Sequence, residues 1–117
     1  MKLTILAVGK ARKTVEAELW ADWLRRCPFP TQLQEFESHL PAGSARIKDE
    51  SEKLLSYINQ RSRSPKRVIS LDPNGINVTS EELATMIGQW RAEGVCQCFF
   101  AIGGADGHHP VLLKAAD

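Results

Sequence analysis

The chain has 117 residues, 43% of them hydrophobic, which is enough to fold as one domain around a modest core. Its 15 basic and 14 acidic residues nearly cancel, which argues against a strongly basic, free-standing nucleic-acid-binding protein. Three cysteines favour reduced thiols, and no segment has the character of a secretory signal or a membrane span. We therefore expect a single domain over residues 1–117 in a soluble, cytoplasmic protein.

The first third of the chain alternates strand and helix patterns. Leu3–Val8 is an apolar run that ends at Gly9, which predicts a first, central strand. Thr14 is suited to cap a helix, in which Val15, Leu19, Trp20, Trp23 and Leu24 recur at helical spacing. Pro28 and Pro30 stop that helix, and residues 33–36 frame a weaker, short strand.

The middle of the chain predicts a long amphipathic helix and a basic connection. Ser44 is suited to cap the helix, which carries Ile47, Leu54, Leu55 and Ile58 on one side and charges on the other. Residues 61–67 read Arg-Ser-Arg-Ser-Pro-Lys-Arg and predict a basic loop. A solvated connector is the simpler interpretation of this loop, and a local RNA contact is the alternative.

The last third predicts two more strands. Val68–Asp72 is a strand that breaks at the turn Pro73-Asn74-Gly75. A helix capped by Thr79 or Ser80 follows, with Leu83, Ile87 and Trp90 facing inward, and it ends at Gly94. Residues 96–102 form the next strand, residues 103–107 a glycine-rich turn, and residues 110–116 the start of another helix. This alternation predicts an α/β fold whose largely parallel sheet has helices on both faces.

Two of the predicted strands end in turns of the kind that meet ligands, over residues 71–75 and 102–107. Ligands of open α/β sheets lie outside the carboxyl ends of the strands, so neighbouring strands would place these turns as two walls of one crevice. Such a crevice suits a nucleoside cofactor that the glycines allow to approach the backbone. The dinucleotide and phosphate-loop motifs are missing from the sequence, which disfavours a generic nucleotide-binding module.

The other chemistry-bearing residues point to ordinary structural roles. Cys96, Cys98 and the His108-His109 pair invite a zinc site, but the cysteine spacing within an apolar strand is wrong, so we predict no metal. Asp72 and Asp106 are possible bases, although carboxylates at turns more often bind their own backbone.

Four segments together resemble the RlmH family of SPOUT-type methyltransferases: Met1–Lys10, Val68–Gly75, Ser80–Ala84 and Phe100–Gly107. They occur in the family's order and at family-like spacing across the whole chain. The resemblance implies a knotted α/β fold and S-adenosylmethionine-dependent methylation of N3 of a pseudouridine in large-subunit ribosomal RNA. It also implies a homodimer that acts on the assembled ribosome. Leu71 matches a position whose backbone contacts the cofactor, and Gly103 and Gly104 match the glycine-rich cofactor loop.

Members of that family continue past the position of Asp117 through a further strand, a cofactor loop, a Pro-His segment and a final helix. The resemblance therefore implies a SPOUT-like fold that lacks its C-terminal, knot-forming segment, and we expect this chain alone to bind the cofactor weakly or not at all. The catalytic base remains unassigned. A non-catalytic fragment that acts as an oligomeric or interaction module is the alternative function.

Overall fold

The computed structural model describes residues 1–9, 15–61, 65–103 and 108. Their elements are, in chain order, β1 (Lys2–Val8), α1 (Val15–Arg26), β2 (Thr31–Phe36), α2 (Ser44–Arg61), β3 (Lys66–Leu71), α3 (Ser80–Ala92) and β4 (Gln97–Ile102). This order confirms the predicted alternation of strands and helices. The cap predicted at Thr14 and the helix predicted over residues 110–116 lie outside the described residues.

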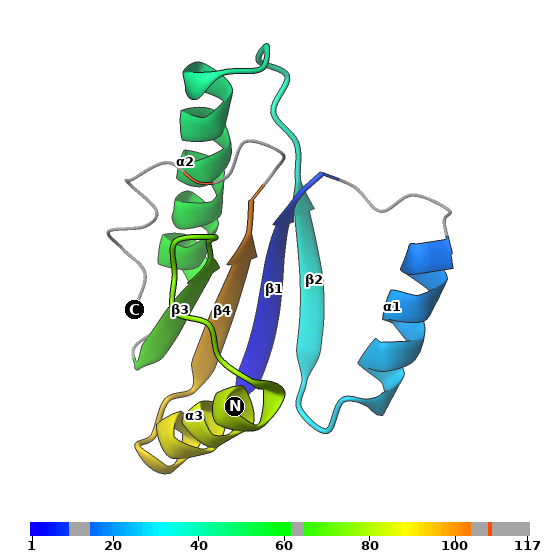
Figure 1. The fold of residues 1–117 in the computed structure, drawn as a ribbon, viewed down its shortest axis with the longest axis vertical. Helices are drawn as coiled ribbons and strands as arrows, with labels where there is room; N and C mark the ends of the chain where they lie inside the picture. Colours follow the sequence, from blue (N-terminus) through cyan, green and yellow to red (C-terminus); the bar gives the residue numbers. More distant parts are fainter. Residues whose placement is uncertain (10–14, 62–64, 104–107, 109–117) are drawn as a thin grey trace.

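The four strands form one parallel sheet in the order β2-β1-β4-β3 (Figure 1). β1 and β4 are the two inner strands, so the prediction of a central first strand is confirmed. Parallel strands need crossover connections, and each connection here contains a helix. The β1–β2 and β3–β4 connections run one way along the sheet, and the β2–β3 connection runs the other way. Because such crossovers are right-handed, this reversal places helices on both faces.

The hydrophobic core lies between the sheet and α2. Strand side chains alternate between the faces, and the strand register aligns Leu6 with Ala101 and Val68 with Phe99 on the α2 side. These four residues are buried together with Leu54 and Ile58 of α2. Burial of each large apolar side chain stabilises the fold by roughly 1.5–3 kcal/mol. At the edge of the core, Gln32 Nε2 donates a 3.0 Å hydrogen bond to the hydroxyl of Tyr57.

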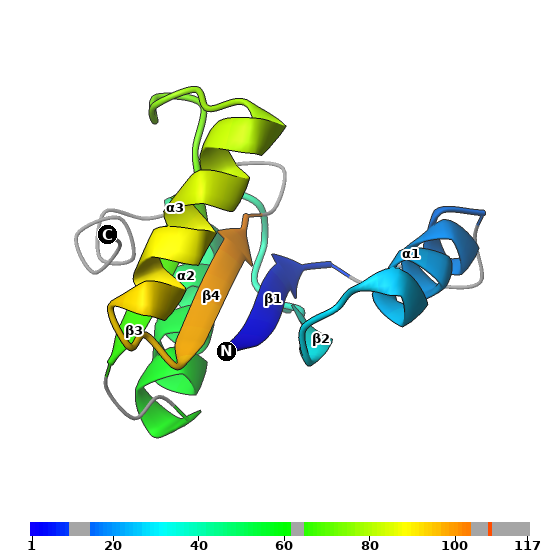
Figure 2. The ribbon, with the colours of Figure 1, turned by 90° about the horizontal axis from the view of Figure 1, so that it is seen from below.

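The opposite face of the sheet is covered less completely. α3 lies across it near the amino ends of the strands, and α1 stands beyond the β2 edge (Figures 1 and 2). Neither helix contains a buried residue. The apolar positions of α1 therefore do not all turn inward: Val15, Leu19 and Trp23 are 78%, 57% and 58% exposed. None of the described helices is long and apolar enough to span a membrane.

Several element boundaries differ from the sequence-based ones by one or two residues. β3 begins at Lys66, because Cys96 N donates to the carbonyl of Pro65 at 3.1 Å and extends the pairing between β3 and β4. Of the two residues predicted as possible N-caps of α3, Thr79 is the cap, because its Oγ1 accepts a 3.0 Å hydrogen bond from Glu82 N. Gly94 follows α3 with φ +91°, a value that favours glycine, as the predicted stop requires.

Candidate functional site

The two segments predicted from the sequence as ligand-binding turns follow neighbouring strands, β3 and β4. Leu71 pairs with Ile102 in the register of β3 and β4, so both strands end at the same level of the sheet. Gly103 comes directly after this pair, whereas Gly104 lies outside the described residues. The side chains of Leu71 and Ile102 are 52% and 40% exposed, which leaves an apolar rim at the carboxyl edge. The two strands are neighbours, as a shared crevice between their turns requires. Contact of Leu71, Gly103 and Gly104 with a cofactor stays a prediction.

The turn after β3 is built by Asp72. Its Oδ1 accepts a 2.8 Å hydrogen bond from Asn74 N, and its carbonyl accepts a 3.0 Å bond from Gly75 N. A Cβ added at Gly75 would lie 3.2 Å from that carbonyl oxygen, so the turn is closely fitted around a glycine. The carboxylate of Asp72 therefore holds its own backbone through Oδ1, as turn carboxylates commonly do. Asp106 lies outside the described residues.

A histidine beyond β4 lies against the end of that strand, which the sequence did not indicate. His108 Nε2 lies 3.2 Å from the carbonyl oxygen of Ala101, so the imidazole is within hydrogen-bond distance of the second-last residue of β4. Cys96 and Cys98 lie at the other end of β4 and do not meet His108. Among the described residues, no three His, Cys, Asp or Glu side chains are grouped so as to hold a metal ion. His109 lies outside the described residues, and the absence of a metal stays a prediction.

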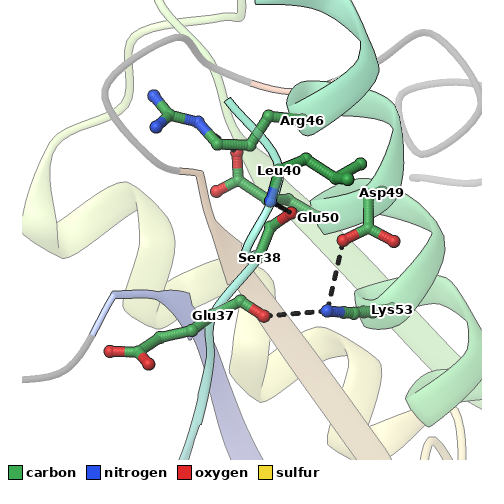
Figure 3. Close-up of polar contacts among 7 residues, drawn as sticks. All are labelled: Glu37, Ser38, Leu40, Arg46, Asp49, Glu50 and Lys53. Carbon is green, nitrogen blue, oxygen red and sulfur yellow. Dashed lines mark hydrogen bonds and ion pairs between the residues drawn. The ribbon is translucent and has the colours of Figure 1, made fainter. Parts of the chain in front are cut away.

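A polar cluster joins the end of β2 to α2 at the same edge of the sheet, and sequence reasoning missed it (Figure 3). Lys53 Nζ donates to the carbonyl of Glu37 at 2.8 Å and lies 3.1 Å from Asp49 Oδ2. A hydrogen bond from the Ser38 side chain, and then one from Lys53, lowers the pKa of Asp49. These contacts tie residues 37–40 to the helix.

One turn nearer the start of α2, Arg46 lies over a buried carboxylate. Arg46 Nε is 3.8 Å from Glu50 Oε1, and Glu50 is almost fully removed from water (Figure 3). The only sequence signal for this pair, and for the Asp49–Lys53 pair, is the spacing of opposite charges four residues apart. Both pairs lie within α2, and the bond of Lys53 to the Glu37 carbonyl ties the β2–α2 connection, which borders the carboxyl edge of the sheet, to the helix.

A separate apolar groove lies on the less covered face. It has a volume of about 400 Å³ and is lined by residues of β1, α1 and the start of β2. Leu3 and Ile5 line it from the sheet, and Trp20 and Leu24 line it from α1. Leu3 and Ile5 belong to the amino-terminal part of β1, so the groove is not the crevice predicted at the carboxyl ends of β3 and β4.

The comparisons with known proteins concern the whole chain. The family model described as "Predicted SPOUT methyltransferase" matches residues 1–117. A protein of Paramagnetospirillum magneticum named ribosomal RNA large subunit methyltransferase H is 35% identical over 118 residues, which cover 100% of this chain and 75% of the relative. Proteins of the same name from Novosphingobium aromaticivorans and Hyphomonas neptunium are 32% and 34% identical, with 72% and 75% of their lengths covered.

The parallel α/β sheet, the whole-chain match and these identities agree with one another. The chain therefore belongs to the SPOUT methyltransferase family and is a methyltransferase.

Proposed function

We propose that this methyltransferase transfers a methyl group from S-adenosylmethionine to N3 of a pseudouridine in large-subunit ribosomal RNA. The names of its relatives support the RNA substrate, since they match essentially the whole of this chain. The single structural observation that carries the proposal is the pairing of Leu71 with Ile102. This pairing brings the segments after β3 and β4, both predicted to bind a ligand, to the same carboxyl edge of the sheet. We further propose that the enzyme works in the cytoplasm, as a homodimer, on the assembled ribosome.

The residues at this edge fit a nucleoside cofactor. β3 is an edge strand of the described sheet, so one row of its backbone groups lies outside the described ladder. The exposed Leu71 and Ile102 side chains offer apolar contact to a purine ring. The Ser70 hydroxyl, one residue before Leu71, is buried without a hydrogen-bond partner among the described residues. The absence of a side chain at Gly103 lets a ligand approach the backbone after β4.

S-adenosylmethionine supplies an electrophilic methyl group when it is bound. The described residues would bind and orient this cofactor. The ends of β3 and β4 would hold its nucleoside, and Gly103 would leave room for it. Methyl transfer to a ring nitrogen needs an in-line approach, so positioning accounts for much of the acceleration. Asp72 is committed to its turn and is not offered as the base that removes the ring proton.

Some of the described basic side chains lie away from this edge. Lys66 and Arg67 begin β3, roughly 16 and 13 Å from its carboxyl end at about 3.3 Å per residue. Arg25 and Arg26 both pair with Asp22 at 2.9 and 3.0 Å, which reduces their charge toward solvent. A ribosomal RNA substrate is large enough to reach these residues, and a homodimer would combine the patches of two copies.

The proposal is tested by two measurements on the 117-residue chain. The first is calorimetric titration with S-adenosylmethionine, in which saturable binding supports the proposed site. The second is transfer of a labelled methyl group to ribosomes from a strain that lacks this methylation, with mass spectrometry of the digested nucleosides. A folded chain that neither binds the donor nor labels the ribosome would favour the non-catalytic interaction module instead.

A further inference from the structure

The described lysines and arginines divide into those with an ion-pair partner and those without. The partnered side chains each lie within 4 Å of a carboxylate: Arg25, Arg26, Arg46, Lys48, Lys53 and Arg67. Among the described residues, Lys2, Arg61, Lys66 and Arg91 make no ion pair. The cations that remain uncompensated are not scattered, because all four lie at the amino ends of the strands.

The order of the elements explains this grouping. Lys2 begins β1 and Lys66 begins β3, and Arg61 is the last residue of α2, which runs from the carboxyl edge of the sheet to the amino edge (Figure 1). Arg91 lies in the last turn of α3, the helix that crosses the sheet near the amino ends of the strands (Figure 2). We name Lys2, Arg61, Lys66 and Arg91 the amino-edge patch.

The strand register places the two lysines of the patch in one row. Lys2 and Lys66 both pair with Gln97 of β4, so their backbones are two strand spacings apart, roughly 10 Å. Side chains alternate along a strand, so both lysines share the sheet face of Leu6 and Val68, the face that α2 covers. The residue between them is an uncharged amide. The row therefore carries two positive charges with no carboxylate in it.

The two arginines of the patch are held by aromatic rings instead of carboxylates. Arg61 Cζ lies 4.3 Å from the centroid of the Tyr57 ring, and Arg91 Cζ lies 5.5 Å from that of Phe29. The hydroxyl of Tyr57 accepts a 3.0 Å hydrogen bond from Gln32 Nε2, which fixes the first ring. A guanidinium held in this way keeps its charge and loses little freedom on binding, so it is suited to donate two hydrogen bonds to a phosphate.

The carboxylate beside the patch is already engaged. Glu93 Oε2 lies 3.7 Å from Arg67 Nη2, and its Oε1 accepts a 3.1 Å hydrogen bond from Gln89 Nε2. The net charge of the chain is only +1, so the patch is a local positive field and not a share of general basicity. Such a field attracts a polyanion, and an RNA strand can reach both ends of β3, which are roughly 16 Å apart.

We infer that the amino-edge patch binds the phosphate backbone of the RNA substrate, at the end of the sheet opposite the proposed cofactor edge. The patch holds RNA by charge, reads no base and takes no part in methyl transfer. It lets one RNA molecule be anchored at one edge while a nucleotide of that molecule is presented at the other. The choice of RNA as the partner rests on the proposed function.

The first test measures RNA binding without the reaction. Fluorescence anisotropy follows a fluorescein-labelled oligouridylate at several salt concentrations. Lys2→Gln with Lys66→Gln should weaken binding about tenfold at low salt and lower the slope of log K against log salt by about 0.7 for each lost charge. Lys2→Arg with Lys66→Arg keeps both charges and should restore the original affinity and slope. Circular dichroism checks that each variant keeps its helix content.

The matched control is Lys48→Gln, which removes an equivalent charge from a lysine that pairs with Glu52 at 3.9 Å on α2. It should bind the oligouridylate with the affinity of the original chain. The inference is overturned by an original chain that does not bind, by a double variant with unchanged affinity and salt slope, or by an equal loss in the control. Tighter binding of polyglutamate than of oligouridylate would assign the patch to an acidic protein and also overturn it.

The second test separates anchoring from chemistry. In methyl transfer to ribosomes that lack the modification, the lysine double variant should raise KM for ribosomes about tenfold and leave kcat unchanged, because only ground-state binding is lost. Its calorimetric affinity for S-adenosylmethionine should equal that of the original chain. A lower kcat at unchanged KM would place these lysines in the reaction and contradict the inference.

The two proposals fail in different ways. A chain that binds oligouridylate through the patch but does not methylate ribosomes leaves the patch intact and removes the proposed reaction. A chain that methylates ribosomes with the same KM and salt dependence after both lysines are replaced retains the reaction and removes the patch.

Discussion

Leu71 and Ile102 face each other as the last residues of β3 and β4, with both side chains partly open to solvent. This pairing makes two turns that are about 30 residues apart in sequence neighbours in space. Strand residues in the body of the sheet are covered by α2 on one side, but the ends of β3 and β4 keep an accessible apolar rim, and β3 is an edge strand of the described sheet. A flat aromatic ligand fits such an edge better than it fits the closed core.

Gly103→Val should weaken binding of S-adenosylmethionine about tenfold or more, since the branched side chain occupies the approach to the backbone after β4. Calorimetric titration measures the effect. Gly88→Ala is the matched control, because a Cβ at this exposed position of α3 meets nothing within 4 Å. The control should bind the donor normally and gain about 0.5–1 kcal/mol of stability, as glycine in a helix interior is unfavourable. Equal binding of S-adenosylmethionine by both variants would show that Gly103 is not part of the cofactor site.

Thr79→Ala should destabilise the protein by about 1 kcal/mol, because it removes the acceptor of the Glu82 amide at the start of α3. Ser80→Ala, one residue later and also exposed, should change the free energy of unfolding by much less. Urea denaturation followed by circular dichroism measures both variants. The opposite ranking would assign the cap to Ser80.

The three thiols should differ in reactivity in the folded protein. Burial raises the pKa of the Cys98 thiol, against smaller opposing effects of Arg67 and the N-terminus, and its side chain is inaccessible. Cys96 is exposed, so iodoacetamide at pH 8 should modify Cys96 first and Cys98 last, with peptide mass spectrometry as the readout.

The raised pKa of Cys98 also has a consequence for stability. Folded Cys98 keeps a proton that the unfolded chain releases above the ordinary thiol pKa of 9.0, so its contribution to stability declines as the pH rises past that value. Cys98→Ala should flatten this part of the stability profile, measured by urea denaturation at several pH values. Rapid alkylation of Cys98 in the native state would contradict the burial of β4.

The carboxylate of Asp49 should titrate below the usual range of aspartates, because Ser38 and then Lys53 donate hydrogen bonds to its charged form. Ser38→Ala should raise this pKa toward its ordinary value, and NMR titration of the Asp49 side chain measures the change. Stability from this group is present above the pKa of an unfolded aspartate and is lost as the pH falls through the lower, folded value. Ser56→Ala, on an exposed part of α2, is the control and should leave Asp49 unchanged.

Apolar periodicity and turn residues were sufficient to predict all seven described elements and the parallel sheet. Leu54 and Ile58 of α2 recur at helical spacing and are buried as that spacing predicts. The outward position of Val15 and Trp23 could not be predicted, because periodicity identifies apolar positions on a helix but not the surface that covers them. The polar cluster around Lys53 was missed since one of its acceptors is the backbone carbonyl of Glu37, which leaves no trace in side-chain identity.

The candidate site was partly predictable. The turns after β3 and β4 have a sequence signature in their glycines and Asp72, whereas the adjacency of the two strands depends on long-range pairing. The approach of His108 to the Ala101 carbonyl depends on the path of the chain after β4, which side-chain type alone does not specify.

The strand order also constrains how the polypeptide assembles as it is synthesised. β4 is the last strand in the described sequence, and it lies between β1 and β3. The β1–β2 ribbon is complete once residue 36 is available, but within the described sheet β3 has no neighbour until residues 97–102 have emerged. The sheet therefore closes late, by insertion of its final strand into a prepared gap, and nascent chains stalled before β4 expose an unpaired β3 edge to chaperones and to one another.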